Sequence, residues 1–190
     1  MRVHLTGVAP VMKVSLPDGL GTARLMLRAP TMDDGPAIFE RWARDPDVVR
    51  YLTWGPHDSV DTVYEFLRRC QTVRESGNGM AWVLTLTGNG SPVGMLDVRP
   101  GPHGIELGYV LGRAYWNHGY MTEAVQAVAA WLLDQPRIYR VWAVCDVDNR
   151  ASARVLQKAG FRQEGVLRRW TVHPNAGAEP RDCLCYARVK

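Results

Sequence analysis

The chain lacks several features that mark particular classes of protein. Its 190 residues contain no apolar run that approaches the length needed to cross a bilayer, which is about 20 residues. The four cysteines form no CxxC pair, so the usual spacing of a zinc site is missing. Internal repeats and low-complexity tracts are also absent. These absences argue against a membrane-spanning protein, a zinc protein and a repeat protein, and they favour a cytoplasmic domain with free thiols.

The first 22 residues lack the pattern of a secretion signal. Their apolar segment, residues 8–12, is too short for the core of such a signal, and Lys13 and Pro17 interrupt the stretch after it. We therefore expect residues 1–22 to form a poorly ordered or loosely packed extension. One domain is expected to span residues 23–190, which is long enough to bury a substantial core.

No block of like charge occurs either. The formal net charge is +4, but Lys and Arg are spread along the chain, so no stripe for direct nucleic-acid binding is predicted. A mildly basic balance suits a polyanionic small ligand, and an incidental surplus of Lys and Arg is the alternative.

Turn residues and hydrophobic periodicity divide the chain into strands and helices. Strands are expected at residues 24–28, 81–86, 93–98, 106–111, 140–144, from 161 onward and at 183–189, and helices at 31–44, 59–76, 120–134 and 149–159. The strands on either side of the 120–134 helix should lie parallel and adjacent, because a crossover helix joins them. The prediction is a mixed α/β fold with one twisted, mostly antiparallel sheet flanked by helices.

The most informative segment spans residues 106–124. Its first part, residues 106–111, is rich in β-formers and is followed by a turn that contains Asn117, His118 and Gly119. A helix that begins from such a turn directs unpaired backbone N–H groups at one point, which favours an anion, most often a phosphate. A plain turn between strand and helix is the alternative, and His118 by itself is more typical of a solvated loop.

The order of elements and three motifs resemble the GNAT superfamily of acyl-CoA N-acyltransferases over nearly the whole chain. The branch that acetylates the N-terminal amines of ribosomal proteins has the phosphate turn aromatic-Trp-Gly-x-Gly-Tyr-x-Thr-Glu-Ala. Residues 115–124 of this chain read Tyr-Trp-Asn-His-Gly-Tyr-Met-Thr-Glu-Ala. The other matches are Asn149-x-x-Ser152 followed by residues 158–161, and residues 165–168 with Arg-Asp at 181–182.

The resemblance implies acetyl-CoA as the co-substrate and no metal. The backbone N–H groups of residues 117–122 would bind the pyrophosphate. The pantetheine arm would lie between the two parallel strands, which splay apart, and would pair with the backbone near Val110 and Leu111. A backbone N–H near Val110 would face the acetyl oxygen. The wider superfamily has Arg or Gln in place of the tryptophan and Gly or Ala in place of the methionine, but backbone donors survive both changes. The residues implied for the cofactor are Val110, Leu111, Trp116, Asn117, His118, Gly119, Tyr120, Met121, Thr122 and Asn149.

The resemblance also implies two catalytic residues. Glu106 stands where several GNAT members carry a glutamate base; a structural hydrogen bond or attraction of a cationic substrate is the alternative. The tyrosine acid of many members would lie eight residues after Asn149, where this chain has Gln157, which carries no titratable proton. Ser152 is the donor proposed in the ribosomal branch, but serine is also common in the first turn of a helix. A CoA thiolate can also leave without a dedicated acid.

The acceptor site is expected to be built from aromatic residues on loops. Tyr51 and Trp54 should face Arg168, Trp170 and a hairpin tip at 171–180; packing under the loop is the alternative. The implied reaction is direct acetyl transfer to a primary amine, either a protein N-terminus, including that of a ribosomal protein, or a small molecule. A CoA-binding sensor module and an RNA-associated protein are rival functions, and a homodimer is left open.

Overall fold

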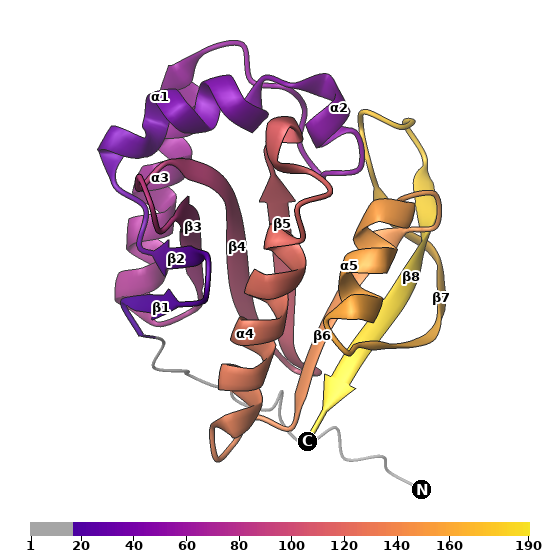
Figure 1. The fold of residues 1–190 in the computed structure, drawn as a ribbon. Helices are drawn as coiled ribbons and strands as arrows, with labels where there is room; N and C mark the ends of the chain where they lie inside the picture. The colour runs from indigo at the N-terminus through magenta and orange to yellow at the C-terminus, as the bar shows by residue number, and fades with distance from the viewer. Residues whose placement is uncertain (1–16) are drawn as a thin grey trace, which may run out of the picture.

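The computed structural model describes residues 17–190 (Figure 1). The predicted extension therefore lies largely outside the described residues. Its described part contains strand β1 (Gly19–Gly21), which pairs antiparallel with β2 (Leu25–Arg28). The sheet therefore begins before residue 23.

Eight strands form one sheet in the order β1-β2-β3-β4-β5-β6-β8-β7. The remaining strands are β3 (Met80–Leu86), β4 (Pro92–Gly101), β5 (Gly104–Leu111), β6 (Arg140–Asp146), β7 (Arg162–Val172) and β8 (Pro180–Val189). Every neighbouring pair is antiparallel except β5 and β6, which are parallel. The predicted fold class and the parallel pair are confirmed.

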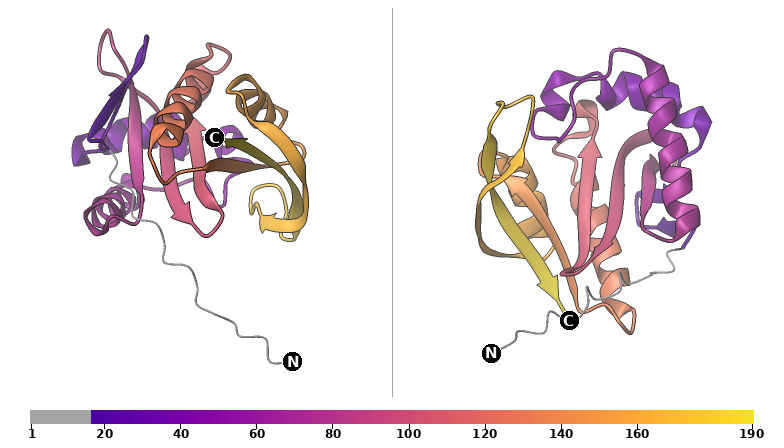
Figure 2. Two further views of the ribbon diagram at one scale, coloured as in Figure 1. Left: turned by 90° about the horizontal axis from the view of Figure 1, so that it is seen from below. Right: turned by 180° about the vertical axis from the view of Figure 1, so that it is seen from behind.

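Helices pack on both faces of this sheet. They are α1 (Gly35–Ile38), α2 (Pro46–Val49), α3 (Val60–Ser76), α4 (Tyr120–Asp134) and α5 (Arg150–Lys158). Helices α4 and α5 cover one face, α3 packs on the other beside β3, and α1 and α2 lie over the end where β5 and β6 diverge (Figures 1 and 2). The predicted bounds of α4 are confirmed.

The helix expected over residues 31–44 is divided into three joined segments. A 3-10 turn (Met32–Asp34) precedes α1, and a π-helical segment (Phe39–Ala43) follows it. In the π segment the Arg44 N–H donates to the Phe39 carbonyl at 3.3 Å, a five-residue step. The chain therefore bends gradually around the end of the sheet.

Each face of the sheet has its own apolar core, because successive side chains of a strand point to opposite faces. On the α4 face, buried residues such as Leu96, Leu107 and Val125 pack together. On the α3 face, Trp42 and Val83 belong to a second, smaller cluster. The strands of the central sheet are thus anchored from both sides.

The parallel pair is short. Strands β5 and β6 pair only at Ile105–Val141 and Glu106–Trp142 within the described chain. Beyond this point β5 continues beside β4, and β6 continues beside β8. The two halves of the sheet therefore diverge toward the end that carries α1 and α2 (Figure 1), and the predicted splayed pair is confirmed.

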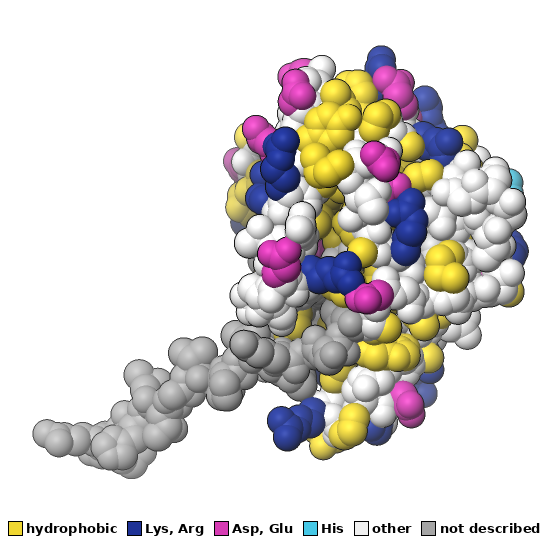
Figure 3. All heavy atoms as spheres, turned by 90° about the vertical axis from the view of Figure 1, so that its left-hand side faces the viewer, with side chains coloured by type: hydrophobic (Ala, Val, Ile, Leu, Met, Phe, Trp, Pro, Cys, Tyr) yellow, Lys and Arg dark blue, Asp and Glu magenta, His cyan; other side chains and the backbone are white. Residues whose placement is uncertain are grey.

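Surface charge is mixed on the face shown in Figure 3, where basic and acidic side chains are interspersed. No helix of residues 17–190 combines the length and apolar character required to span a bilayer.

Candidate active site

The start of α4 carries free backbone donors. Helix α4 begins after Gly119, which has a left-handed backbone (φ 80°) and provides no side-chain cap. Asn117 is also left-handed (φ 63°). Across residues 17–190, no acceptor bonds any of the backbone N–H groups of residues 117–122. Such alternating turns form an anion-binding concavity, and the positive end of the 15-residue helix strengthens it.

Side chains hold this turn in place from three directions. The indole Nε1 of Trp116 donates to the Leu111 carbonyl at 2.8 Å, and His118 Nδ1 lies 2.8 Å from the Trp116 carbonyl. Arg24 Nη1 donates to the His118 carbonyl at 3.0 Å, while its Nε lies 2.7 Å from a Glu123 carboxylate oxygen. The turn is therefore tied both to the end of β5 and to the strand region near the N-terminus.

The predicted cofactor residues around this turn divide into two groups. The ring of Tyr120 stacks on His118 with centroids 5.6 Å apart, and the Arg24 guanidinium lies 4.7 Å over the Tyr120 ring. The side chains of His118 and Tyr120 therefore lie near the surface. Met121 is buried in the core, so its side chain points away from the turn as expected, and the Thr122 side chain is half-buried beside the free N–H groups.

The backbone of β5 presents alternate residues to the gap beside β6. Gly112 N–H donates to the Val93 carbonyl at 2.9 Å, so Gly112 and Val93 are a hydrogen-bonded residue pair of the antiparallel β4–β5 ladder. By the alternation of antiparallel ladders, Val110 also directs its backbone groups toward β4. Tyr109 and Leu111 direct theirs toward the gap. Of the two residues predicted to pair with an extended ligand, Leu111 is the one whose backbone faces it.

A pair of hydroxyl groups bridges the gap. Tyr109 Oη lies 2.7 Å from Ser152 Oγ, which joins β5 to the first turn of α5. Asn149 caps α5 by accepting a hydrogen bond from Ser152 N at 3.1 Å. Burial raises the pKa of Tyr109 above its usual range, although the Ser152 hydrogen bond opposes the shift, so the phenol stays protonated at neutral pH. Gln157, in contrast, is exposed and donates to Tyr186.

Glu106 is part of a carboxylate pair that one arginine joins. Arg99 Nη2 lies 3.2 Å from Glu106 Oε1, and Arg99 Nη1 lies 2.9 Å from Asp97 Oδ2. Glu106 therefore makes a structural ion pair while 28% of its side chain remains exposed. Sequence reasoning missed Asp97, although an acid inside the apolar run Val93–Val98 was a visible signal.

On the acceptor side, the hairpin tip between β7 and β8 docks on the loop after α2. Asn175 Nδ2 donates to the carbonyls of Val49 and Trp54, each at 2.8 Å. The His173 ring contacts Tyr51 edge-on with centroids 6.5 Å apart. The predicted contact of Tyr51 and Trp54 with the hairpin tip is present, and His173 and Asn175 make it.

Asp146, at the end of β6, also holds the hairpin tip between β7 and β8 in place. The fully buried Asp146 accepts hydrogen bonds from Arg181 at 2.5 and 3.0 Å, and His173 Nε2 lies 3.7 Å from the same carboxylate. Burial disfavours the ionised form of Asp146, but the Arg181 guanidinium outweighs it and holds the pKa of that carboxyl below its usual range. The tip is thus attached to both halves of the molecule.

The structure does not bring Arg168 and Trp170 to this place. Their side chains are exposed, and no hydrogen bond, ion pair or ring contact within residues 17–190 joins them to Tyr51 or Trp54. The register of β7 against β8 shifts between Leu167 and Thr171. Such a bulge resets the alternation of the strand, so the direction of these two side chains could not be predicted from spacing.

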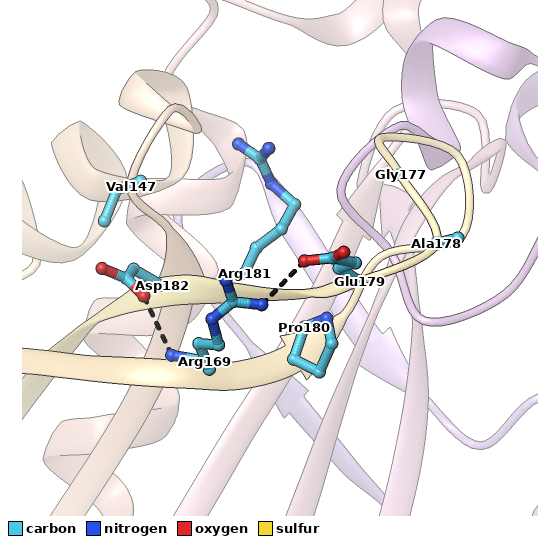
Figure 4. A pocket seen from close by; sticks show the side chains of 8 residues that line it. All are labelled: Val147, Arg169, Gly177, Ala178, Glu179, Pro180, Arg181 and Asp182. Carbon is cyan, nitrogen blue, oxygen red and sulfur yellow. Dashed lines mark hydrogen bonds and ion pairs between the residues drawn. The ribbon is translucent and has the colours of Figure 1, made fainter.

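A shallow pocket of about 440 Å³ lies near the base of the hairpin tip (Figure 4). Within it, Arg169 N donates to Asp182 at 2.9 Å and the Arg169 guanidinium pairs with Glu179 at 2.7 Å. The pocket is lined by Val147, Arg169, Gly177, Ala178, Glu179, Pro180, Arg181 and Asp182. None of these is a residue predicted for the site.

The cysteines are all free and buried. Burial raises the pKa of the Cys70, Cys145 and Cys183 thiols to about 11, so they are protonated and poorly nucleophilic at neutral pH. Residues 17–190 contain no group of three or more side chains arranged to hold a metal ion.

Comparison with known proteins agrees with this geometry. The model of the acetyltransferase (GNAT) domain matches residues 24–162. The chain is 28% identical to the uncharacterised N-acetyltransferase YoaA of Bacillus subtilis over 178 residues, which cover 90% of this chain and 96% of the relative. The crystal structure of a GNAT-family acetyltransferase from Bacillus anthracis is similar with a TM-score of 0.78 and 27% identity, covering 90% and 98% of the two chains.

A further solved structure shares the fold. The ribosomal-protein α-N-acetyltransferase RimL, determined with coenzyme A, is similar with a TM-score of 0.77. The identity is 21%, and the match covers 88% of this chain and 95% of that one.

Proposed function

Because the chain belongs to the GNAT acetyltransferase family, we propose that it transfers an acetyl group from acetyl-CoA to a primary amine. One observation carries this proposal: the free backbone N–H groups of residues 117–122 lie at the start of α4, directly after the strand that borders the gap. A phosphate group at the turn would satisfy these donors, and an extended thioester arm would add to the edge of β5 in the gap.

The proposed binding mode follows the two sets of donors. The pyrophosphate binds the N–H groups of residues 117–122, with the Thr122 hydroxyl beside them. The pantetheine arm enters the gap from the turn and pairs with the Leu111 N–H, as an extended chain adds to a strand edge. RimL, which shares the fold, was solved with coenzyme A, and this supports the same ligand here.

The proposed chemistry is direct attack by a neutral amine. The amine nitrogen forms a bond to the thioester carbon while the carbon–sulfur bond breaks, and the amine loses one proton. Lysine-like amines are protonated at neutral pH, so a base must first accept a proton. One carboxylate of the pair formed by Glu106 and Asp97, on the sheet face opposite α4, accepts this proton.

Two groups stabilise the charges that develop. The Tyr109 N–H, which faces the gap one step deeper than Leu111, donates to the thioester oxygen as negative charge grows there, and a donor of this kind is typically worth about 2.7–4 kcal/mol of barrier. Ser152, oriented by Tyr109, donates a proton to the departing thiolate. Asn149 supports this arrangement by capping the helix that carries Ser152.

The acceptor enters under the hairpin tip, beside Tyr51 and Trp54. The substrate class is a primary amine, either a protein N-terminus or a small molecule, and RimL supports the first of these through its own named activity. The catalytic unit is residues 23–190 together with β1, and the buried free thiols suit the cytoplasm.

The test is an acceptor screen with a thiol-release readout. The protein is mixed with acetyl-CoA and a panel of N-terminal peptides, polyamines and amino-acid derivatives, and mass spectrometry identifies the product. We expect release of free CoA with at least one amine and an added acetyl group on that amine. Tight CoA binding without turnover on any amine would contradict the proposal and favour a CoA-binding sensor.

A further inference from the structure

The side chain of Asp97 lies across β5 at a position where β5 has no side chain. Asp97 is paired in register with Gly108. A Cβ atom placed on Gly108 would stand 2.4 Å from Asp97 Oδ1 and 2.9 Å from Arg99 Nη2. The absence of a side chain at Gly108 therefore creates the space in which the carboxylate and the guanidinium lie.

This space opens on the sheet face that faces away from α4. Glu106, Gly108 and Val110 alternate onto one face of β5, and Val110 packs against the apolar cluster on the α3 side. Figure 2 (right) shows no helix of residues 17–190 over β5 and β6 on that face. The Asp97 side chain is 35% exposed there, so an acceptor amine can reach it.

Asp97 is also closer than Glu106 to Tyr109, beside which the thioester is proposed to lie. Asp97 is paired in register with Gly108, the residue before Tyr109. Glu106 precedes Tyr109 by three residues along the strand, a separation of roughly 10 Å. Of the two carboxylates, Asp97 is therefore the one nearer to this part of β5.

The groups around Asp97 also favour it as the proton acceptor. Arg99 faces Asp97 from its own strand, Glu106 lies beyond the guanidinium on β5, and Cys70 faces Asp97 from α3. Burial raises the pKa of Asp97, and Arg99 offsets only part of that shift. A carboxylate with increased proton affinity is the better proton acceptor near neutral pH.

We propose, on the basis of the proposed function, that Asp97 is the catalytic base that takes the proton from the acceptor amine. Asp97 accepts the proton of the ammonium form, directly or through one water, and the neutral nitrogen then bonds to the thioester carbon. The thiolate leaves with the electron pair of the carbon–sulfur bond, and the second proton, lost by the nitrogen as the amide forms, balances the proton that the thiolate takes up. Arg99 and Glu106 are positioning residues. The guanidinium orients the Asp97 carboxylate, and Glu106 holds the guanidinium.

The test compares Asp97→Asn with Glu106→Gln over a range of pH. We expect Asp97→Asn to lower kcat by about 100-fold or more at pH 7, the usual contribution of a positioned base, with CoA affinity unchanged. Its activity should recover in part as the pH rises toward the pKa of the amine. Glu106→Gln should lower kcat by less than about tenfold and keep the shape of the parent profile.

Two further variants keep the test decisive. Gly108→Ala places a methyl group against the Asp97 carboxylate without removing a charge, and it should also lower kcat more than it changes CoA affinity. Asp134→Asn, an exposed acid at the far end of α4, is the matched control and should behave like the parent. Each variant is checked for CoA binding and thermal unfolding.

The outcomes separate the two proposals. If the parent turns over an amine and Asp97→Asn stays within twofold of it, Asp97 is not the base, and the acetyltransferase proposal still stands. A larger loss in Glu106→Gln than in Asp97→Asn would overturn the assignment and return the role to Glu106. If the parent binds CoA but acetylates no amine, both proposals fail together.

Discussion

Helices α4 and α5 occupy equivalent places in the fold, but their first turns are satisfied differently. Each helix follows one strand of the parallel pair. The first turn of α5 is capped from within, because Asn149 accepts the Ser152 N–H. The first turn of α4 has no side-chain cap within residues 17–190, and Gly119 stands where a capping side chain would be. The start of α4 therefore leaves donors available for the proposed phosphate, whereas the start of α5 is capped by the protein itself.

The backbone conformation of the turn before α4 also differs from that of the residue that caps α5. Asn117 is left-handed although it is not glycine, a conformation that costs about 1–2 kcal/mol for most residues and less for asparagine. Asn149, in contrast, has a negative φ of −80°. Unfavourable conformations persist mainly where they contribute to function. The turn before α4 thus carries a small conformational cost that the cap of α5 does not.

The change with the largest expected effect places a negative charge in the α4 turn. Gly119→Glu should weaken CoA binding by at least about 100-fold, because the side chain is strained at positive φ and its carboxylate repels the phosphates. Gly160→Glu is the matched control, since Gly160 has a similar φ of 85° and ends α5 in open space. Calorimetric titration measures both affinities; equal affinities in the two variants would remove the distinction between the helices.

A smaller effect is expected from the hydroxyl pair at the α5 turn. Ser152→Ala and Tyr109→Phe should each lower kcat by about tenfold, the value of one hydrogen bond of about 1.4 kcal/mol, with little change in CoA affinity. Because the two groups act together, the double variant should be little worse than either single one. Gln157→Ala serves as the control and should match the parent. Additive losses in the steady-state kinetics would show that the two hydroxyl groups act independently.

The smallest effect concerns stability rather than turnover. Asn149→Ala removes the cap of α5 and should lower the free energy of unfolding by about 1 kcal/mol, measured by urea denaturation. Coenzyme A at 100 times its Kd should raise the stability of the parent by about 2.7 kcal/mol, because it binds only the folded state. An unchanged denaturation midpoint in Asn149→Ala would mean that α5 does not depend on its cap.

The sequence predicted the elements whose signals are local. Helix α4 has the bounds that its apolar periodicity and Pro136 indicate, and Asn149 caps α5 as expected. The adjacent parallel pair followed from the crossover connection, and its splay followed from the resemblance to the GNAT superfamily. The polar turn before α4 was predicted from Gly119 and its small polar neighbours, and phosphate binding by that turn stays a prediction. These features depend on residues close together in the chain.

The features that the sequence did not reveal depend on register and docking. The position of Asp97 over Gly108 depends on how β4 pairs with β5, and Tyr109 meets Ser152 only after α5 has packed on the sheet. The directions of Arg168 and Trp170 depend on a bulge that no composition signal marks. Side-chain contacts between distant segments therefore had to come from the structure.

The short ladder between β5 and β6 has a consequence for how the free protein avoids aggregation. A strand with unpaired amides is a template on which another chain can add, and proteins usually protect such strands at the rim of a sheet. Here the incomplete strand edge lies in the interior of the sheet, with β6 and α5 on its other side. An unpaired edge enclosed in this way is less open to edge-to-edge pairing with another folded chain than an edge at the rim of the sheet.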